Sequence, residues 1–349
     1  MSATSIILPA EWVPQRAVML TWPHADTDWR ARLDETEAVF LAIAREISAR
    51  EALVICCHDV SHKKAIATKL ERAQIPGERV ALFIHASNDS WARDHGPLSV
   101  IKHGRVCLLD FEFNGWGGKY PAGKDNRLTR ALHEQGAFGD TPLVSLPFVL
   151  EGGSIDSDGQ GTILSTTTCL LSPTRNPGFD QTAIENTLRD YLGIRRILWL
   201  QQGQLQGDDT DSHIDMLARF CNATTIAYSS CEDESDEHFL PLRAMKQELA
   251  AFRTPAGNAY GLVPLPIPRA IFNAQGQRLP ASYANFLIIN EAVLVPQYND
   301  PADDIALTRL QSCFPKRDII GINCLPIIQQ YGSLHCLTMQ LPKAPGSKP

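Results

Sequence analysis

Four short stretches of this 349-residue chain combine glycine with dense polar side chains. Between them they offer a thiol, an imidazole and three carboxylates at the ends of strand-like runs: Cys336, His213, Asp94, Glu151 and Asp215. The stretches are NDSWARDHGP (88–97), LEGGSIDSDGQGT (150–162), GDDTDSHIDMLARF (207–220) and YGSLHCLTMQ (331–340).

These residue types suit attack on a planar, cationic carbon. A guanidinium is always charged and presents its N–H groups in a rigid fork that carboxylates match bidentately. A thiolate is the strongest nucleophile that a side chain offers near neutral pH. An imidazole can protonate departing ammonia and then activate water.

The thiol of Cys336 stands where a Gly-Ser turn gives way to an apolar run. Alone it could be a packed hydrophobe, as free cysteines commonly are, or a nucleophile at a strand end. If the segment is a strand, its neighbour His335 points to the opposite face. His213 is therefore the predicted partner of the thiol.

The carboxylates each have a second interpretation. His213 and Asp215 are two residues apart and share one face if they lie on a strand, but DDTDSH is also typical of a solvated acidic loop. Asp94 could form a surface ion pair of little energetic value. Glu151 ends the apolar run PFVL before two glycines, where another group can approach closely, or where the strand simply reaches water.

Strand-like and helix-like segments must position these residues. Helices are predicted over 33–48, 62–74, 126–135, 180–191, 236–252 and 302–313, the fourth beginning at the N-cap Asp180 and ending at Gly193. Strands are predicted over 17–22, 52–57, 80–85, 106–111, 142–146, 162–166, 196–200, 224–229, 262–267, 285–290, 292–296 and 318–323.

Strands outnumber helices about two to one, so a plain βαβ alternation does not fit. The rhythm predicts an α/β fold built from units of a few strands and one helix, each roughly 60–70 residues long. No linker divides the chain, which predicts one catalytic domain over 1–343 and a disordered tail over 344–349.

Composition narrows the class of protein. The net charge of −7 disfavours nucleic-acid binding. Neither a signal peptide nor an apolar run of about 18 residues is present, so we expect no membrane segment. The nine cysteines lack zinc-ligand spacing, which predicts no metal site and reduced thiols in the cytoplasm.

The polar stretches, in their order, resemble the agmatine deiminase family of the guanidino-group-modifying pentein superfamily, which also holds bacterial-type peptidylarginine deiminases. The similarity covers nearly the whole chain. It also includes TWPHADTDW (21–29), FNGWGGKY (113–120), LLSPTRNPG (170–178), SYANF (282–286) and VPQYND (295–300).

The resemblance implies a five-bladed β/α propeller of ββαβ units with pseudo-fivefold symmetry, no cofactor, and a homodimer. It implies that Cys336 forms an amidino-cysteine intermediate and that His213 is the general acid/base. Asp94 and Asp215 would grip the guanidinium, and Glu151 would lie beside the histidine and contact substrate. Trp91 and Asn285 match an aromatic and an asparagine of the substrate pocket.

The expected reaction is hydrolysis of agmatine to N-carbamoylputrescine and ammonia, a step of putrescine synthesis. Two departures from the family pattern affect the pocket rim: Ser333-Leu334 replaces Asn-Ile, and Asp211-Ser212 replaces Asn-Gly. Deimination of arginine or peptidyl-arginine therefore stays open as an alternative. It would be favoured if Lys119, Lys124 or Arg127 bound a carboxylate of the substrate. A non-catalytic pentein scaffold is the alternative from another class.

Overall fold

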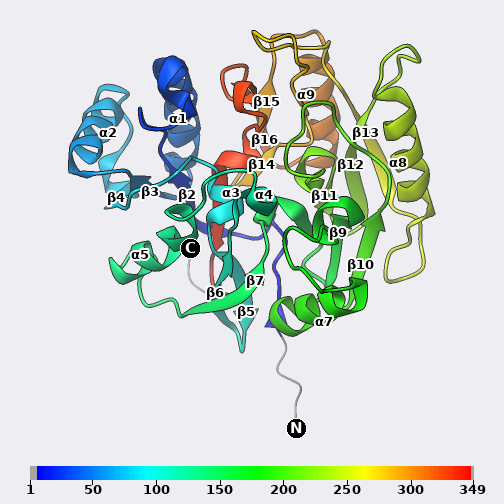
Figure 1. Cartoon of the computed structure of the whole chain (residues 1–349), viewed down its shortest axis with the longest axis horizontal. Helices are drawn as coiled ribbons and strands as arrows, with labels where there is room; N and C mark the ends of the chain where they lie inside the picture. Colours follow the sequence, from blue (N-terminus) through cyan, green and yellow to red (C-terminus); the bar gives the residue numbers. More distant parts are fainter. Residues whose placement is uncertain (1–5, 347–349) are drawn as a thin grey trace.

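The computed structural model of the chain describes residues 6–346. Within them the strands form five separate sheets (Figure 1). Their strands, in spatial order, are β1 (Ile6–Ile7), β5 (Leu98–Lys102), β6 (Arg105–Glu112) and β7 (Leu143–Val149); β10 (Arg196–Leu200), β9 (Thr162–Thr166) and β8 (Ile155–Ser157); β11 (Ala218–Asn222), β12 (Thr225–Ser230) and β13 (Gly261–Pro266); β14 (Leu287–Ile289), β15 (Ala292–Gln297) and β16 (Asp318–Asn323); and β17 (Thr338–Pro342), β2 (Gln15–Thr21), β3 (Ala52–Cys57) and β4 (Val80–Ile84).

Each sheet contains the same unit. Two strands pair antiparallel, as β11 does with β12, and the second pairs in parallel with a third strand that follows a helical connection, as β12 does with β13. The C-terminal strand β17 completes the last unit by pairing antiparallel with β2 near the N-terminus. The predicted repeat of strands and one helix is thus confirmed as a ββαβ unit.

The longer helices lie toward the periphery of the molecule, whereas α3 lies near the centre of the view (Figure 1). The helices are α1 (Leu33–Ser48), α2 (Val60–Arg72), α3 (Ala92–His95), α4 (Gly115–Gly118), α5 (Leu128–Glu134), α6 (Thr167–Leu170), α7 (Gln181–Leu192), α8 (Phe239–Ala251) and α9 (Ala302–Cys313). No helix among residues 6–346 is long and apolar enough to cross a membrane.

The predicted helices match six of these within a few residues. α7 begins as expected: Asp180 accepts a hydrogen bond from the Ala183 N–H at 2.8 Å. It ends at Gly193, whose φ of 71° is the left-handed conformation that glycine adopts freely. Of the predicted tail over 344–349, residues 345–346 form a turn, and 347–349 lie outside the described residues.

At two places the strand, one of the interpretations that the sequence left open, is not what forms. His213 and Asp215 do not lie on a strand, because His213 precedes a 3₁₀ turn over Ile214–Met216, and the strand begins only at Ala218. Cys336 is likewise in a 3₁₀ turn, His335–Leu337, immediately before β17. Successive side chains are about 120° apart in such a turn, instead of the 180° of a strand.

Candidate active site

Gly153 marks the point where three functional side chains from distant parts of the chain meet. A Cβ atom at this position would lie 2.6 Å from His213 Nδ1, 2.8 Å from Asp94 Oδ1 and 3.1 Å from Asp215 Oδ2. Only glycine leaves room for all three. The predicted close approach behind Glu151 is therefore confirmed, since the second of its two glycines supplies the space.

Asp94 lies in α3 and is held from two sides. Trp116 Nε1 donates to its Oδ2 at 2.9 Å, and the Gly153 N–H donates to its Oδ1 at 3.0 Å. His213 Nδ1 lies 3.6 Å from the same Oδ1. The carboxyl is 4% exposed, so its interpretation as a solvated surface ion pair fails.

Cys336 is held among polar groups. Asn285 Nδ2 lies 3.2 Å from its sulfur, and the thiol lies 3.6 Å from Asp215 Oδ2. Asn285 Oδ1 also accepts the backbone N–H of His335 at 2.9 Å, so one amide fixes the turn and faces the thiol. The structure thus brings Cys336, Asn285 and Asp215 together.

His335 does not point away from the thiol's surroundings, as the strand assumption predicted. Its Nδ1 lies 2.8 Å from Asp215 Oδ2, the same oxygen that Cys336 faces. The 3₁₀ turn lets both neighbours reach one carboxylate.

Glu151 is fully buried, and its interpretation as a strand end in water is wrong. Arg175 Nε donates to both carboxylate oxygens, at 2.9 and 3.0 Å. Arg175 Nη1 also donates to Asp211 at 2.6 Å, and Lys119 forms an ion pair with the other oxygen of Asp211. No role was predicted for Arg175, although it lies in the LLSPTRNPG stretch.

A cavity of about 480 Å³, open to solvent, leads to this group of residues. Trp91, Asp94 and Cys336 line it, and Gly332 lets the Trp91 indole approach, since a Cβ there would lie 2.2 Å from the ring. The other lining residues are Asp28, Asp89, Trp116, Tyr120, Asp209, Thr210, Gln330, Tyr331 and Gly332. His213, Glu151, Asp215 and Asn285 are buried around the inner end and are not part of this lining.

Burial and the charges of the site shift the pKa values of its thiol, imidazole and carboxyl groups. Burial, Asp215 and Asp94 together raise the pKa of the Cys336 thiol well above its ordinary value. Burial lowers the pKa of His213, but Asp94 and Cys169 outweigh it and hold that pKa well above the usual range. Burial raises the pKa of Asp94. At neutral pH the free site therefore holds a protonated thiol and a protonated imidazole.

Cys169 is a second buried thiol at the site. One ligand atom each from Glu151, Cys169 and His213 lies within 4.8 Å of the others, which raises the question of a metal. The group does not suit one, because the Arg175 guanidinium already occupies both oxygens of Glu151 and would repel a cation.

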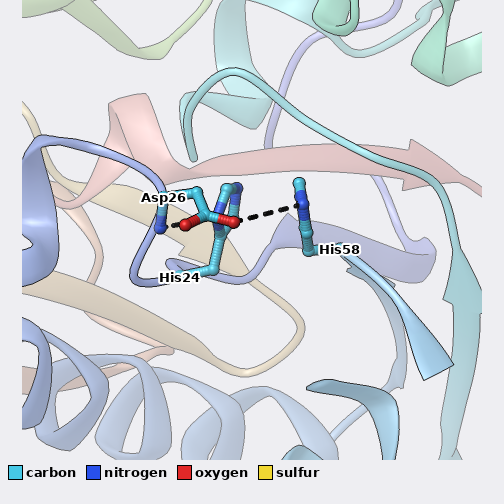
Figure 2. Close-up of side chains that lie close together, drawn as sticks. All are labelled: His24, Asp26 and His58. Carbon is cyan, nitrogen blue, oxygen red and sulfur yellow. Dashed lines mark hydrogen bonds and ion pairs between the residues drawn. The ribbon is translucent and has the colours of Figure 1, made fainter. Parts of the chain in front are cut away.

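His24, Asp26 and His58 form another cluster of metal-ligand types (Figure 2). His24 Nδ1 accepts the Asp26 N–H at 3.3 Å, and His58 Nδ1 accepts the Ser87 N–H at 3.4 Å. Each ring therefore carries its hydrogen on Nε2. The Nε2 of His24 faces Ser87 Oγ, and the Nε2 of His58 faces the Asp26 carboxylate. In this arrangement the Nδ1 lone pairs of both rings are already engaged by backbone N–H groups.

Comparisons with known proteins show the family of this chain. The sequence family described as Porphyromonas-type peptidyl-arginine deiminase matches residues 7–342. The chain belongs to this family. It is 32% identical to the agmatine deiminase of Pseudomonas aeruginosa, over 96% of this chain and 95% of that one.

Solved structures of this family superpose closely. A provisionally named arginine deiminase from Porphyromonas gingivalis is 48% identical with a TM-score of 0.90, covering 97% of this chain and 99% of the other. A cysteine-to-serine variant of the C. jejuni agmatine deiminase, with substrate bound, is 36% identical with a TM-score of 0.90 over 99% and 98%. An amidinotransferase of Streptomyces griseus, 13% identical with a TM-score of 0.53 over 99% of this chain and 98% of the other, shares only the mixed α/β fold.

Proposed function

We propose that this protein is an agmatine deiminase, which hydrolyses agmatine to N-carbamoylputrescine and ammonia without a metal or organic cofactor. The inner end of the cavity supports deimination, because Cys336 and Asp94 line it while Asp215 lies 3.6 Å from the thiol. The family membership and the relatives named agmatine deiminase support the same reaction.

The charges that line the cavity favour agmatine as the substrate. Agmatine has an ammonium where arginine also has a carboxylate. Besides Asp94, three carboxylates, Asp28, Asp89 and Asp209, line the cavity, and no lysine or arginine is among its lining residues. Such walls favour a cationic distal group and disfavour an anionic one. Lys119, a candidate reader of a carboxylate, is instead paired with Asp211.

The reaction would begin with the guanidinium held by Asp94 and Asp215. Binding of the substrate cation favours loss of the Cys336 proton to solvent, and the resulting thiolate attacks the central carbon and forms a C–S bond. His213 gives its proton to the departing nitrogen, so the C–N bond breaks, ammonia leaves and an amidino-cysteine remains. Water then adds to that carbon while His213 takes a proton from it. The C–S bond breaks, which releases the urea product and restores the thiolate and the protonated His213.

The remaining residues would support these steps. Glu151 lies beside His213 with its charge balanced by Arg175. Asn285 Nδ2 faces the sulfur and can stabilise the thiolate by hydrogen bonding. Trp91 forms an aromatic wall against which the alkyl chain and the planar guanidinium can pack.

Arginine or peptidyl-arginine is the second candidate substrate. Solved structures named as an arginine deiminase and as a peptidyl-arginine deiminase are 48% and 43% identical to this chain. Those identities exceed the 36% of the agmatine deiminase with bound substrate. The carboxylate-lined cavity is the observation that favours agmatine over both alternatives.

A substrate panel tests the proposal. Chelator-treated protein is given agmatine, arginine and a C-terminal arginyl peptide, and ammonia is measured. We expect agmatine to have the highest kcat/KM, and Asp209→Asn and Asp28→Asn to raise KM for agmatine more than they lower kcat. Turnover of the peptide but not of agmatine would transfer the assignment to peptidyl-arginine. No turnover of any guanidine would favour a non-catalytic scaffold.

We further propose that the five sheets are the blades of a pseudo-fivefold propeller in one catalytic domain over 1–343. The ββαβ unit in each sheet supports this arrangement. All nine cysteines are unpaired, which supports the expected cytoplasmic location. A homodimer remains part of the proposal through the family resemblance.

A further inference from the structure

A buried chain of charges runs from the thiol to the N-terminal segment through His335. His335 Nδ1 lies 2.8 Å from Asp215 Oδ2, and its Nε2 lies 2.7 Å from Glu11 Oε1. The imidazole is 1% exposed, and 324 residues of sequence separate it from Glu11. It is therefore clamped between two carboxylates, one of which faces Cys336.

Both carboxylates are ionised. Although burial raises the pKa of Asp215, the hydrogen bond and charge of His335 lower it below the usual value. Burial also raises the pKa of Glu11, but Arg219, His335 and Arg93 bring it well below its usual value. Each ring nitrogen of His335 thus faces an oxygen of an ionised carboxylate.

The outer end of this chain of charges, at Glu11, is held by several side chains. Glu11 Oε1 lies 3.3 Å from Arg93 Nη1, Gln340 Nε2 donates to Glu11 Oε2 at 3.0 Å, and Arg219 also binds Oε2. Arg93, Arg219 and Gln340 are all buried. Because rigid partners hold Glu11, the His335 ring cannot swing away from Asp215.

The inner end leaves one oxygen unused. His335 binds Asp215 Oδ2, whereas Asp215 Oδ1 is buried and has no hydrogen-bond partner. A buried carboxylate oxygen without a donor is costly, and such atoms call for an explanation. A guanidinium N–H in the cavity would supply the missing donor.

We propose that His335 is a positioning residue, which holds Asp215 ionised and turned so that its Oδ1 is free to bind the substrate guanidinium. The proposal rests on the proposed function, because the bound group is the guanidinium of that reaction. It assigns His335 no contact with substrate. It also gives Glu11 a part, as the anchor that keeps the imidazole in place.

Two substitutions of His335 distinguish its contact with Asp215 from its contact with Glu11. In asparagine, Nδ2 can occupy the place of the imidazole Nδ1, so His335→Asn keeps a donor toward Asp215. In glutamine, Nε2 can take the place of the imidazole Nε2, so His335→Gln keeps the contact with Glu11 and loses the one with Asp215. His238→Gln is a matched control, because His238 is also buried and its Nδ1 lies 3.0 Å from Asp236.

We expect kcat/KM for agmatine to fall about 10- to 100-fold in His335→Gln, the range for losing a hydrogen bond to a charged group. His335→Asn should lose less. The acid limb of the kcat/KM profile should move to higher pH in His335→Gln, because Asp215 loses the partner that lowers its pKa. His238→Gln should keep the wild-type acid limb. Far-UV circular dichroism checks that each variant folds.

An acid limb unchanged in both folded His335 variants, or a greater loss in His335→Asn than in His335→Gln, would overturn the proposal. If His335→Gln does not fold, the shift in His335→Asn decides, since it too lacks the imidazole. Failure of the proposed function would look different, because wild type itself would then release no ammonia. In that case alkylation of Cys336 against pH still tests His335, since a change in Asp215 must alter the thiol beside it.

Discussion

The histidine cluster at the edge of the β2–β3–β4 sheet should make the protein sensitive to acid. His24 follows β2, and His58 follows its parallel neighbour β3, so both lie at the same edge (Figure 2). Their ring centroids are 3.9 Å apart. Burial and the neighbouring His58 and His62 lower the pKa of His24 to about 4. Protonation would also turn its Nδ1 from an acceptor of the Asp26 N–H into a donor.

The direction and the size of the stability change with pH follow from the pKa of His24. His24 in the unfolded chain takes up a proton near pH 6.5, while the folded form resists it until about pH 4. The folded state therefore binds fewer protons in this window, and its stability falls as the pH falls from about 6.5 to 4. At about 1.4 kcal/mol per pKa unit, the loss from His24 is at most about 3.5 kcal/mol.

His24→Asn tests this reasoning. The asparagine Oδ1 can accept the Asp26 N–H in place of Nδ1, and the residue carries no charge at any pH. We expect the variant to be less stable than wild type at pH 8, where it lacks the ring packing and the hydrogen bond between the ring and Ser87. Its free energy of unfolding should then fall less steeply between pH 6.5 and 4, by up to about 3.5 kcal/mol.

The assay is urea unfolding at several pH values for wild type, His24→Asn and His103→Asn. His103 is exposed in the turn between β5 and β6, so its replacement controls for the loss of any histidine. Contributions from the carboxyl groups cancel in the difference between proteins. A pH dependence equal to that of wild type in His24→Asn would refute the argument, as would an equal flattening in His103→Asn.

Three further predictions concern the site. The apparent pKa for alkylation of Cys336 should fall when a non-reacting guanidinium analogue is bound, and an unchanged value with the thiol still accessible contradicts activation by substrate. Gly153→Ala should abolish deimination in a folded protein, whereas Gly77→Ala, with nothing within 4 Å of its added Cβ, should retain it; comparison of ammonia release and thermal melting decides. Arg175→Met should cost about 3–5 kcal/mol of unfolding free energy by leaving a buried carboxylate unpaired, while Lys119→Met, at a more exposed ion pair, should cost about 1 kcal/mol or less. Equal losses in urea unfolding would contradict that difference.

The sequence was sufficient to predict the outer parts of each ββαβ unit. Their strands and helices are long enough for apolar periodicity to show, as in 52–57 and 302–313. Most first strands of the units were missed: β5, β8, β11 and β17. Each is three to five residues long and lies within, overlaps or directly follows a polar stretch of the site, so hydrophobic periodicity has too few residues to register.

The site residues could be selected by type, but their partners could not. Cysteine, histidine and carboxylates next to glycine already suggested guanidinium chemistry. Arg175 and His335 gain their roles only from contacts across 24 and 120 residues of sequence, which local patterns do not reveal. The error at His335 had a specific cause, because a 3₁₀ turn places neighbours on adjacent sides where a strand would separate them.

The charges of the site explain how one substrate cation can prepare two groups at once. In the free protein Asp94 raises the pKa of both Cys336 and His213, so the thiol is a poor nucleophile and the imidazolium a poor acid. A guanidinium placed against Asp94 would offset its charge and lower both values. The thiol then ionises more readily, and His213 releases its proton more readily to the leaving nitrogen. A cation that does not reach Asp94 would leave both groups inactive, which limits reaction to a correctly seated guanidinium.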